Sequence, residues 1–197
     1  CSALTEIPED LFSNNPNIYE ASYVFNNCDG ITEIPSDLFK NNHELESIYG
    51  LFQQSDGFTS IPEDLFAENT KLQILEYAFN NCRGLTAIPD GLFRNNSDIK
   101  SFCGAFHNCL SLTTVPTNIF DNNRKVINFQ GTFGWCYELE GESPYTVIDG
   151  VKYHLYERHL NPDHFVKPID YLNCFAECHY LDEWEEMKGD PWFNNWQ

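Results

Sequence analysis

The chain has 197 residues, of which 42% are hydrophobic and 21% are charged, as in ordinary folded proteins. Thirty acidic residues against eleven basic ones give a formal net charge of −19, and this charge repels nucleic acids and anionic lipid surfaces. The longest apolar runs are a few residues, well short of the roughly 20 that a membrane-spanning helix needs. We therefore expect no nucleic-acid partner and no membrane-spanning segment.

A repeat of 27 residues organises the first 140 residues. The phrase ALTEIPEDLFSNN at residues 3–15 returns as GITEIPSDLFKNN, GFTSIPEDLFAEN, GLTAIPDGLFRNN and SLTTVPTNIFDNN. The proline of the phrase keeps a constant spacing, at Pro8, Pro35, Pro62, Pro89 and Pro116. Uninterrupted repeats of this length indicate a solenoid, in which each repeat forms one coil and contacts only its neighbours.

Each coil is predicted to contain two short strands and two short helical turns. The phrase LTxIP favours a strand because its proline pushes the preceding residue toward extended geometry. The proline then starts a helical turn, as in PEDLF, with acidic residues at the positive end of the turn. In the second half of a coil, Leu45 and Ile48 mark another strand that precedes a second turn.

Stacked coils lie about 4.8 Å apart, so equivalent residues form columns along the solenoid. We expect the threonine column to bond along itself or to backbone groups. The asparagine column is expected to tolerate left-handed turns and to satisfy backbone groups of the neighbouring coil. These structural roles are favoured over calcium or ligand binding. The columns are Thr5, Thr32, Thr59, Thr86 and Thr113, and Asn15, Asn42, Asn69, Asn96 and Asn123.

Six of the eight cysteines also form a column, and Ser55 fills its one gap. The phrase FxxC places a phenylalanine and a cysteine on one face of a turn, which predicts buried free thiols. Disulfides are disfavoured because stacked side chains point the same way. A zinc site needs four converging ligands, which a linear ladder does not supply, so we predict no metal and no cofactor here. The column comprises Cys1, Cys28, Cys82, Cys109, Cys136 and Cys178.

Cys1 also raises the question of a lipid anchor, because bacterial lipoproteins carry lipid on an N-terminal cysteine. The segment CSALTEIPEDLF aligns without gaps to the later repeats, so Cys1 is predicted to be an ordinary repeat cysteine. We therefore expect the chain to start in mid-repeat, with a lipid anchor in preceding sequence left open.

The repeat is interrupted after Leu139 by the segment YTVIDGVKYHLY. Its Asp149-Gly150 pair predicts a hairpin with a type I′ turn. The repeat resumes in CFAECHYLDEW, where Cys178 follows Cys136 by 42 residues instead of 27. We therefore divide one domain into a solenoid over 1–140 and an expanded terminal repeat with hairpin and cap over 141–197.

Two features of this terminal region suggest binding. His154, His159, Asp163 and His164 are close in sequence, but their spacing fits no strong metal motif, and we predict no metal site. Aromatic residues at the C-terminus offer a stacking surface for sugars or peptides, with core packing as the alternative for at least half of them. The tryptophans concerned are Trp184, Trp192 and Trp196.

The consensus FxxCxxLTxIPxxLFxNNxxL resembles the BspA-like leucine-rich repeats of surface and secreted proteins of mouth and gut anaerobes. The resemblance covers 1–140 and resumes at 174–181. It implies an α/β solenoid, a right-handed leucine-rich-repeat superhelix of 27-residue coils with short parallel strands and short helical turns, to which the hairpin-containing C-terminal cap is added. It also implies a location outside the cell or on the bacterial surface, a role in adhesion or binding, and no shared catalytic residues.

We predict a non-enzymatic module that binds an extracellular protein, with binding to a glycan through Trp184, Trp192 and Trp196 as the alternative. The sequence contains no GxSxG, HExxH or phosphate-binding glycine loop, which argues against an enzyme. The predicted binding surface is the varied column that follows the threonines. It comprises Glu6, Glu33, Ser60, Ala87 and Thr114.

Overall fold

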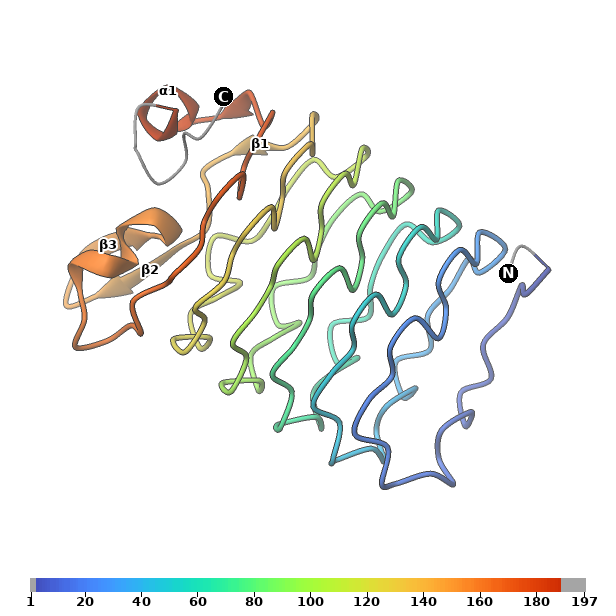
Figure 1. Ribbon diagram of the computed structural model, residues 1–197. Helices are drawn as coiled ribbons and strands as arrows, with labels where there is room; N and C mark the ends of the chain where they lie inside the picture. The colour runs from blue at the N-terminus through green and yellow to red at the C-terminus, as the bar shows by residue number, and fades with distance from the viewer. Residues whose placement is uncertain (1–2, 189–197) are drawn as a thin grey trace.

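A computed structural model describes residues 3–188, and these form a stack of coils that runs from the N-terminal end to a distinct C-terminal cap (Figure 1). One column of parallel single-residue bridges joins the second halves of successive coils. It runs through Glu20, Ser47, Ile74, Ser101, Asn128 and Asp170. The fold is therefore a repeat solenoid, and it continues across the insertion into the terminal coil.

The regular elements inside each coil are shorter than predicted. Over residues 3–139 the backbone forms turns and isolated bridges, with no helix or longer strand. Among the five LTxIP segments, one pair forms a bridge, between Ala87 and Thr114. The proline at the end of each segment has no N–H with which to extend a ladder. The predicted helical turns are single turns, as where Leu65 N donates to Pro62 O at 3.2 Å.

Stacked phenylalanine rings form the core. The centroids of Phe52 and Phe79 lie 5.7 Å apart, and those of Phe79 and Phe106 lie 5.4 Å apart with an interplanar angle of 2°. The same column crosses the insertion, since Phe133 and Phe175 stack at 5.4 Å. Offset aromatic pairs at these distances add to the energy of burial, so the regular spacing of phenylalanine is a packing requirement.

The asparagine column joins each coil to the coil before it. The side-chain amide of buried Asn96 donates from Nδ2 to Phe66 O at 3.0 Å and to Asn69 O at 2.8 Å. Asn42, Asn69 and Asn123 repeat this pair of bonds. The predicted backbone role is therefore confirmed.

The predicted left-handed geometry of these asparagines is wrong. Asn96 N donates to Phe93 O, and Asn96 O accepts from Ile99 N, so the residue belongs to consecutive right-handed turns. The left-handed backbone occurs in two other columns. These are Tyr23, Gly50, Tyr77, Gly104, Gly131 and Asn173, and Asn27, Gln54, Asn81, Asn108, Trp135 and Glu177.

The threonine and cysteine columns also bond between coils. Thr86 Oγ1 donates to Thr59 O at 3.1 Å, as predicted. Cys82 Sγ donates to Phe52 O at 3.1 Å, and Ser55 Oγ makes the equivalent bond to Phe25 O at 2.7 Å. All seven cysteines in the described residues are free and buried, and Cys1 lies outside those residues.

These buried thiols should react slowly with iodoacetamide at pH 8 while the chain is folded. Burial is the first cause that raises the pKa of Cys82, Cys109 and Cys178, so little thiolate is present to attack the reagent. Peptide mapping by mass spectrometry should find these three unmodified until guanidinium is added. Rapid native labelling of Cys82 or Cys109 would show that the ladder opens readily.

Within residues 3–188, the helices and strands all lie in the C-terminal cap (Figure 1). Strand β1 (Glu140–Gly141) pairs in parallel with β4 (Tyr180–Leu181), and β2 (Tyr145–Ile148) pairs antiparallel with β3 (Val151–His154). The predicted hairpin is confirmed, with φ of 52° at Asp149 and 80° at Gly150. A 3-10 helix η1 (Leu155–Leu160) and helix α1 (Trp184–Met187) complete the cap. The boundary at residue 140 between two parts of one domain stays a prediction.

Arg158 of η1 ends the asparagine column. Its Nη1 donates to Asn123 O at 2.9 Å and its Nη2 to Phe120 O at 2.8 Å, which are the two carbonyls that the next asparagine of the column would reach. The guanidinium lies 4.7 Å from the ring centroid of Phe165 and is 1% exposed. Burial lowers the pKa of Arg158 to about 10. The insertion thus supplies one side chain that completes the last regular coil.

Candidate functional site

The predicted binding column is exposed along its length. Glu6, Glu33, Ser60, Ala87 and Thr114 all point to solvent, and a parallel bridge joins Ala87 to Thr114. Their exposure agrees with the prediction, and their role in binding stays a prediction.

The C-terminal aromatics differ from one another. Trp184 begins α1, is half-buried against the core and lies 4.8 Å from the ring of His179. Trp184 therefore packs against the core, which was the alternative to a stacking surface. Trp192 and Trp196 lie outside the described residues.

The four residues considered for metal binding do not converge. His159 Nδ1 lies 2.8 Å from Tyr156 O, and His164 Nδ1 lies 3.0 Å from Asn161 Oδ1, so both rings bond within their own segment. Asp163 is exposed. The ring of His154 lies instead beside Glu142 and Glu183, which are distant from it in sequence.

A line of tyrosine rings occupies the side of the solenoid that carries the long bridge column. The ring centroids of Tyr23 and Tyr49 lie 5.2 Å apart, and those of Tyr49 and Tyr77 lie 5.5 Å apart. We call Tyr23, Tyr49 and Tyr77, with the carboxylates of Glu20, Glu46 and Glu76, the tyrosine face.

Glycine in alternate coils makes room for the rings of Tyr23 and Tyr77. Tyr23, Gly50, Tyr77 and Gly104 occupy one column, and all have left-handed backbone with φ between 56° and 59°. A Cβ on Gly50 would lie 2.6 Å from the ring of Tyr23, and one on Gly104 would lie 2.5 Å from that of Tyr77. Each ring therefore lies across the backbone of the next coil. In the sequence, this arrangement corresponds to tyrosine and glycine alternating in one column, so its period is two coils. A search for the 27-residue period alone does not reveal it.

All residues of the tyrosine face except Tyr77 line an acidic groove of about 610 Å³. Its lining contains three carboxylates and no lysine, arginine or histidine. Ile74, 39% exposed, adds an apolar contact. The acidic and aromatic lining residues are Tyr19, Glu20, Tyr23, Glu46, Tyr49 and Glu76.

The phenol groups of Tyr49 and Tyr77 remain protonated over the physiological range. A hydrogen bond with Tyr23, together with burial and the charge of Glu76, raises the pKa of Tyr49 to about 12. A hydrogen bond with Cys103, whose Sγ lies 3.7 Å from Tyr77 Oη, raises the pKa of Tyr77 to about 12. The negative charge of the groove therefore resides on its glutamates.

A smaller groove of about 290 Å³ continues from Tyr77 toward the cap. His107 and Trp135 line it with ring centroids 4.9 Å apart. Burial lowers the pKa of His107, so this imidazole is neutral near pH 7. Aromatic groups thus extend the tyrosine face across further coils.

No family model matches this chain, and neither does any curated protein. Among solved structures, the APL1 leucine-rich repeat domain matches at 14% identity and a TM-score of 0.46, over 73% of this chain and 37% of that one. The functional domain of InlJ from Listeria monocytogenes, which includes a cysteine ladder, matches at 14% identity and 0.41, over 73% and 28%. A leucine-rich repeat protein from Bacteroides ovatus matches at 20% identity and 0.37, over 66% and 36%.

The chain spans less than two fifths of the length of these three proteins, and the TM-scores are below 0.5. The comparisons therefore carry no inference about activity or partner. In residues 3–188 no helix is long and apolar enough to cross a membrane. The solenoid fold follows from the bridges and stacked columns of the chain itself. The solved structures similar to it include leucine-rich-repeat proteins such as the APL1 domain and the Bacteroides ovatus protein.

Proposed function

We propose that this chain is a protein-interaction module that binds an extended, basic segment of a partner protein on the tyrosine face. The observation that carries the proposal is the groove lined by three glutamates and three tyrosines, with no lysine, arginine or histidine among its lining residues. Tyrosine supplies contact area at small entropic cost and is enriched among energetically dominant interface residues.

The charge of the groove selects the partner. A lysine or arginine side chain in the groove would gain an ion pair with a lining glutamate and contact with the ring of Tyr49. The net charge of −19 adds long-range attraction for a basic partner, which speeds association and is screened by salt. An acidic partner would be repelled by the same field.

Binding without catalysis is the simpler proposal for this site. The nearest thiol, Cys103, is 7% exposed, and burial raises its pKa, so it is a poor nucleophile. The pKa values of Tyr49 and Tyr77 are raised, so these two phenols remain protonated and offer no general base at neutral pH.

The finer assignments also belong to this proposal. We place the module on a bacterial surface or among secreted proteins, as a right-handed BspA-like leucine-rich-repeat protein with a role in adhesion. A lipid anchor in preceding sequence and recognition of a glycan remain alternatives within it. The exposed rings of Tyr19 and Tyr23, 65% and 49% exposed, are the observation that favours a sugar as second candidate.

The Tyr49→Ala variant tests the proposal with a fluorescent Lys-Pro repeat peptide, which is basic and extended. We expect the dissociation constant to rise about 10- to 100-fold, because the change removes a central ring. Fluorescence anisotropy at low and physiological salt gives the affinity, with a Glu-Pro repeat peptide as the negative probe.

The matched pair Glu46→Lys and Glu33→Lys separates the two candidate surfaces. Both changes reverse one exposed charge, but Glu46 lines the groove and Glu33 belongs to the other column. Loss confined to Glu46→Lys supports the tyrosine face, while loss confined to Glu33→Lys moves the site to the column predicted from sequence. Equal affinity for the two peptides would refute the basic preference, and protection of the tyrosines by an oligosaccharide would favour the glycan alternative.

A further inference from the structure

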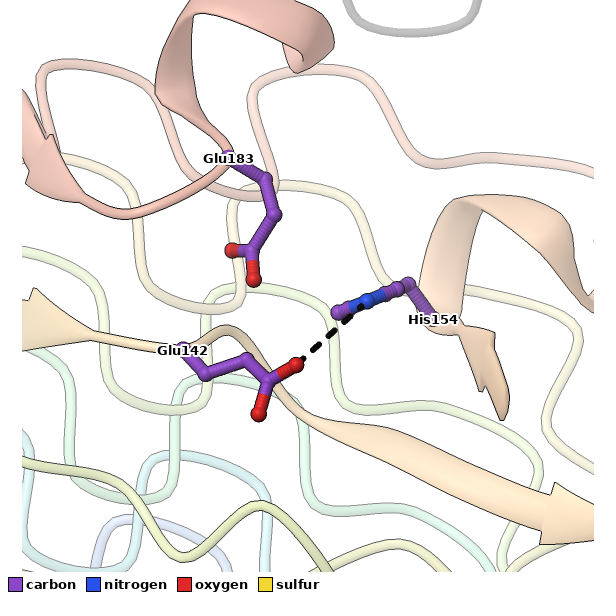
Figure 2. A group of neighbouring side chains, drawn as sticks. All are labelled: Glu142, His154 and Glu183. Atoms are coloured by element: carbon purple, nitrogen blue, oxygen red, sulfur yellow. Dashed lines mark ion pairs between the residues drawn. The ribbon is translucent and has the colours of Figure 1, made fainter. Parts of the chain in front are cut away.

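Three side chains of metal-binding type converge where the cap meets the last coil (Figure 2). Glu142 follows β1, His154 ends β3, and Glu183 precedes α1. One ligand atom from each lies within 4.8 Å of the others. His154 Nε2 is 4.0 Å from Glu142 Oε1, and Figure 2 shows both carboxylates directed toward the imidazole.

The imidazole is held in a fixed orientation. Its Nδ1 lies 2.9 Å from Ser143 Oγ, and its ring stacks on Tyr156 and meets Tyr145 edge-on, with centroids 5.4 and 5.6 Å away. When Nδ1–H donates to Ser143 Oγ, the free lone pair is on Nε2 and faces the carboxylates. His154 is 8% exposed and Ser143 is 1% exposed, so this arrangement is built into the cap.

The same serine positions one of the carboxylates. Ser143 N donates to Glu183 Oε2 at 3.0 Å, which fixes the glutamate that comes from the far side of the insertion. Backbone and hydroxyl of one buried residue thus orient two of the three candidate ligands. Metal sites commonly depend on such supporting hydrogen bonds.

A lysine side chain lies beside the cluster, where a metal ion would bind. Lys152 Nζ forms an ion pair with Glu142 Oε1 and lies 4.1 Å from the ring centroid of Tyr145. The lysine is exposed, so it can rotate into solvent when another cation binds. Two carboxylates beside one ammonium leave the cluster with a net negative charge.

We propose that Glu142, His154 and Glu183 bind one divalent cation of the zinc type, in a site that joins β1, the hairpin and α1. One imidazole nitrogen with two carboxylate oxygens suits Zn²⁺ or Co²⁺ better than Ca²⁺ or Mg²⁺, which prefer oxygen ligands alone. The three ligands leave a fourth tetrahedral position for water. The sequence did not reveal the site because its members come from three segments that the insertion brings together.

Titration of the chelator-treated chain with ZnCl₂, CoCl₂ and CaCl₂ tests the site. We expect one Zn²⁺ per chain by calorimetry, a rise of several degrees in Tm, and a Co²⁺ absorption spectrum of tetrahedral type. Calcium should produce neither binding heat nor a Tm shift at the same concentration. Stoichiometric calcium binding without zinc binding would overturn the assignment.

Three variants locate the ligands. Glu183→Gln keeps an oxygen that can accept from Ser143 N, so the fold is retained, but loss of the charge should weaken Zn²⁺ binding at least tenfold. Lys152→Met removes the competing cation and should strengthen Zn²⁺ binding several-fold, an effect that destabilisation of the cap would not produce. His164→Ala is the control, since His164 bonds to Asn161 outside the cluster.

The proposal is overturned if Glu183→Gln and His154→Ala bind Zn²⁺ as tightly as the unaltered chain, or if His164→Ala abolishes binding. Far-ultraviolet circular dichroism of each metal-free variant shows whether it is folded before titration. An unfolded His154→Ala leaves Glu183→Gln and Lys152→Met to decide the matter.

Discussion

Replacing Arg158 with methionine should lower the free energy of unfolding by about 2–4 kcal/mol, because two charge-assisted hydrogen bonds to the carbonyls of Asn123 and Phe120 are lost. Removal of the cation also relieves a desolvation cost, which is expressed in the lowered pKa of Arg158. The loss should dominate because the guanidinium bonds to both carbonyls and packs on Phe165. Urea denaturation followed by circular dichroism measures the change.

Two further variants serve as controls for the Arg158→Met experiment. Arg83→Met removes an exposed arginine and should change stability by less than about 0.5 kcal/mol. Arg158→Lys keeps the charge but cannot hold both carbonyls in a planar fork, so an intermediate loss is expected. An Arg158→Met variant as stable as the unaltered chain would mean that the cap does not depend on this residue.

Replacing Asn96 with alanine should lower the free energy of unfolding by about 1–3 kcal/mol. The change removes two hydrogen bonds between coils and leaves a small void, while each carbonyl keeps one bond from a turn N–H. Because each coil contacts only its neighbours, the loss weakens one interface of the stack. Thermal and urea unfolding, monitored by circular dichroism, give the difference.

Asn15→Ala is the matched control for that experiment. Asn15 belongs to the same column but is exposed, and its carbonyl, which accepts from Asn42 Nδ2, is retained in the variant. Its stability should change by less than about 0.5 kcal/mol. Equal losses at Asn15 and Asn96 would mean that the buried amides do not join the coils through these hydrogen bonds.

The architecture could be predicted from sequence where the same residues recur every 27 positions. Pro8 to Pro116 fix the length of the coil, and the phenylalanine, asparagine and cysteine columns then follow from stacking. The hairpin was predictable because Asp149-Gly150 is a local signal. The two strands expected in each coil are reduced to isolated bridges. In the first half of the coil the proline prevents the ladder that LTxIP alone would favour. In the second half, left-handed residues such as Gly50 follow three positions after the bridge and end the extended backbone.

The remaining features depend on register between distant segments. The repeat would place the next asparagine 27 residues after Asn123, at Gly150, but Gly150 belongs to the hairpin turn. Arg158 of η1 makes the two hydrogen bonds of that asparagine instead. Two rings of the tyrosine face, Tyr23 and Tyr77, come from a column that alternates with glycine over two coils. The Glu142–His154–Glu183 cluster requires contacts across the insertion, which a pattern along the chain does not specify.

Hydrogen–deuterium exchange with and without the Lys-Pro repeat peptide tests the proposed binding surface most directly. The proposal predicts slower exchange of backbone amides in 19–27, 46–54 and 73–81, which carry the tyrosine face, and little change elsewhere in the solenoid. Protection confined to the segments around Glu6, Glu33 and Ser60, or to 174–188, would contradict it and place the binding surface on the other column or on the cap.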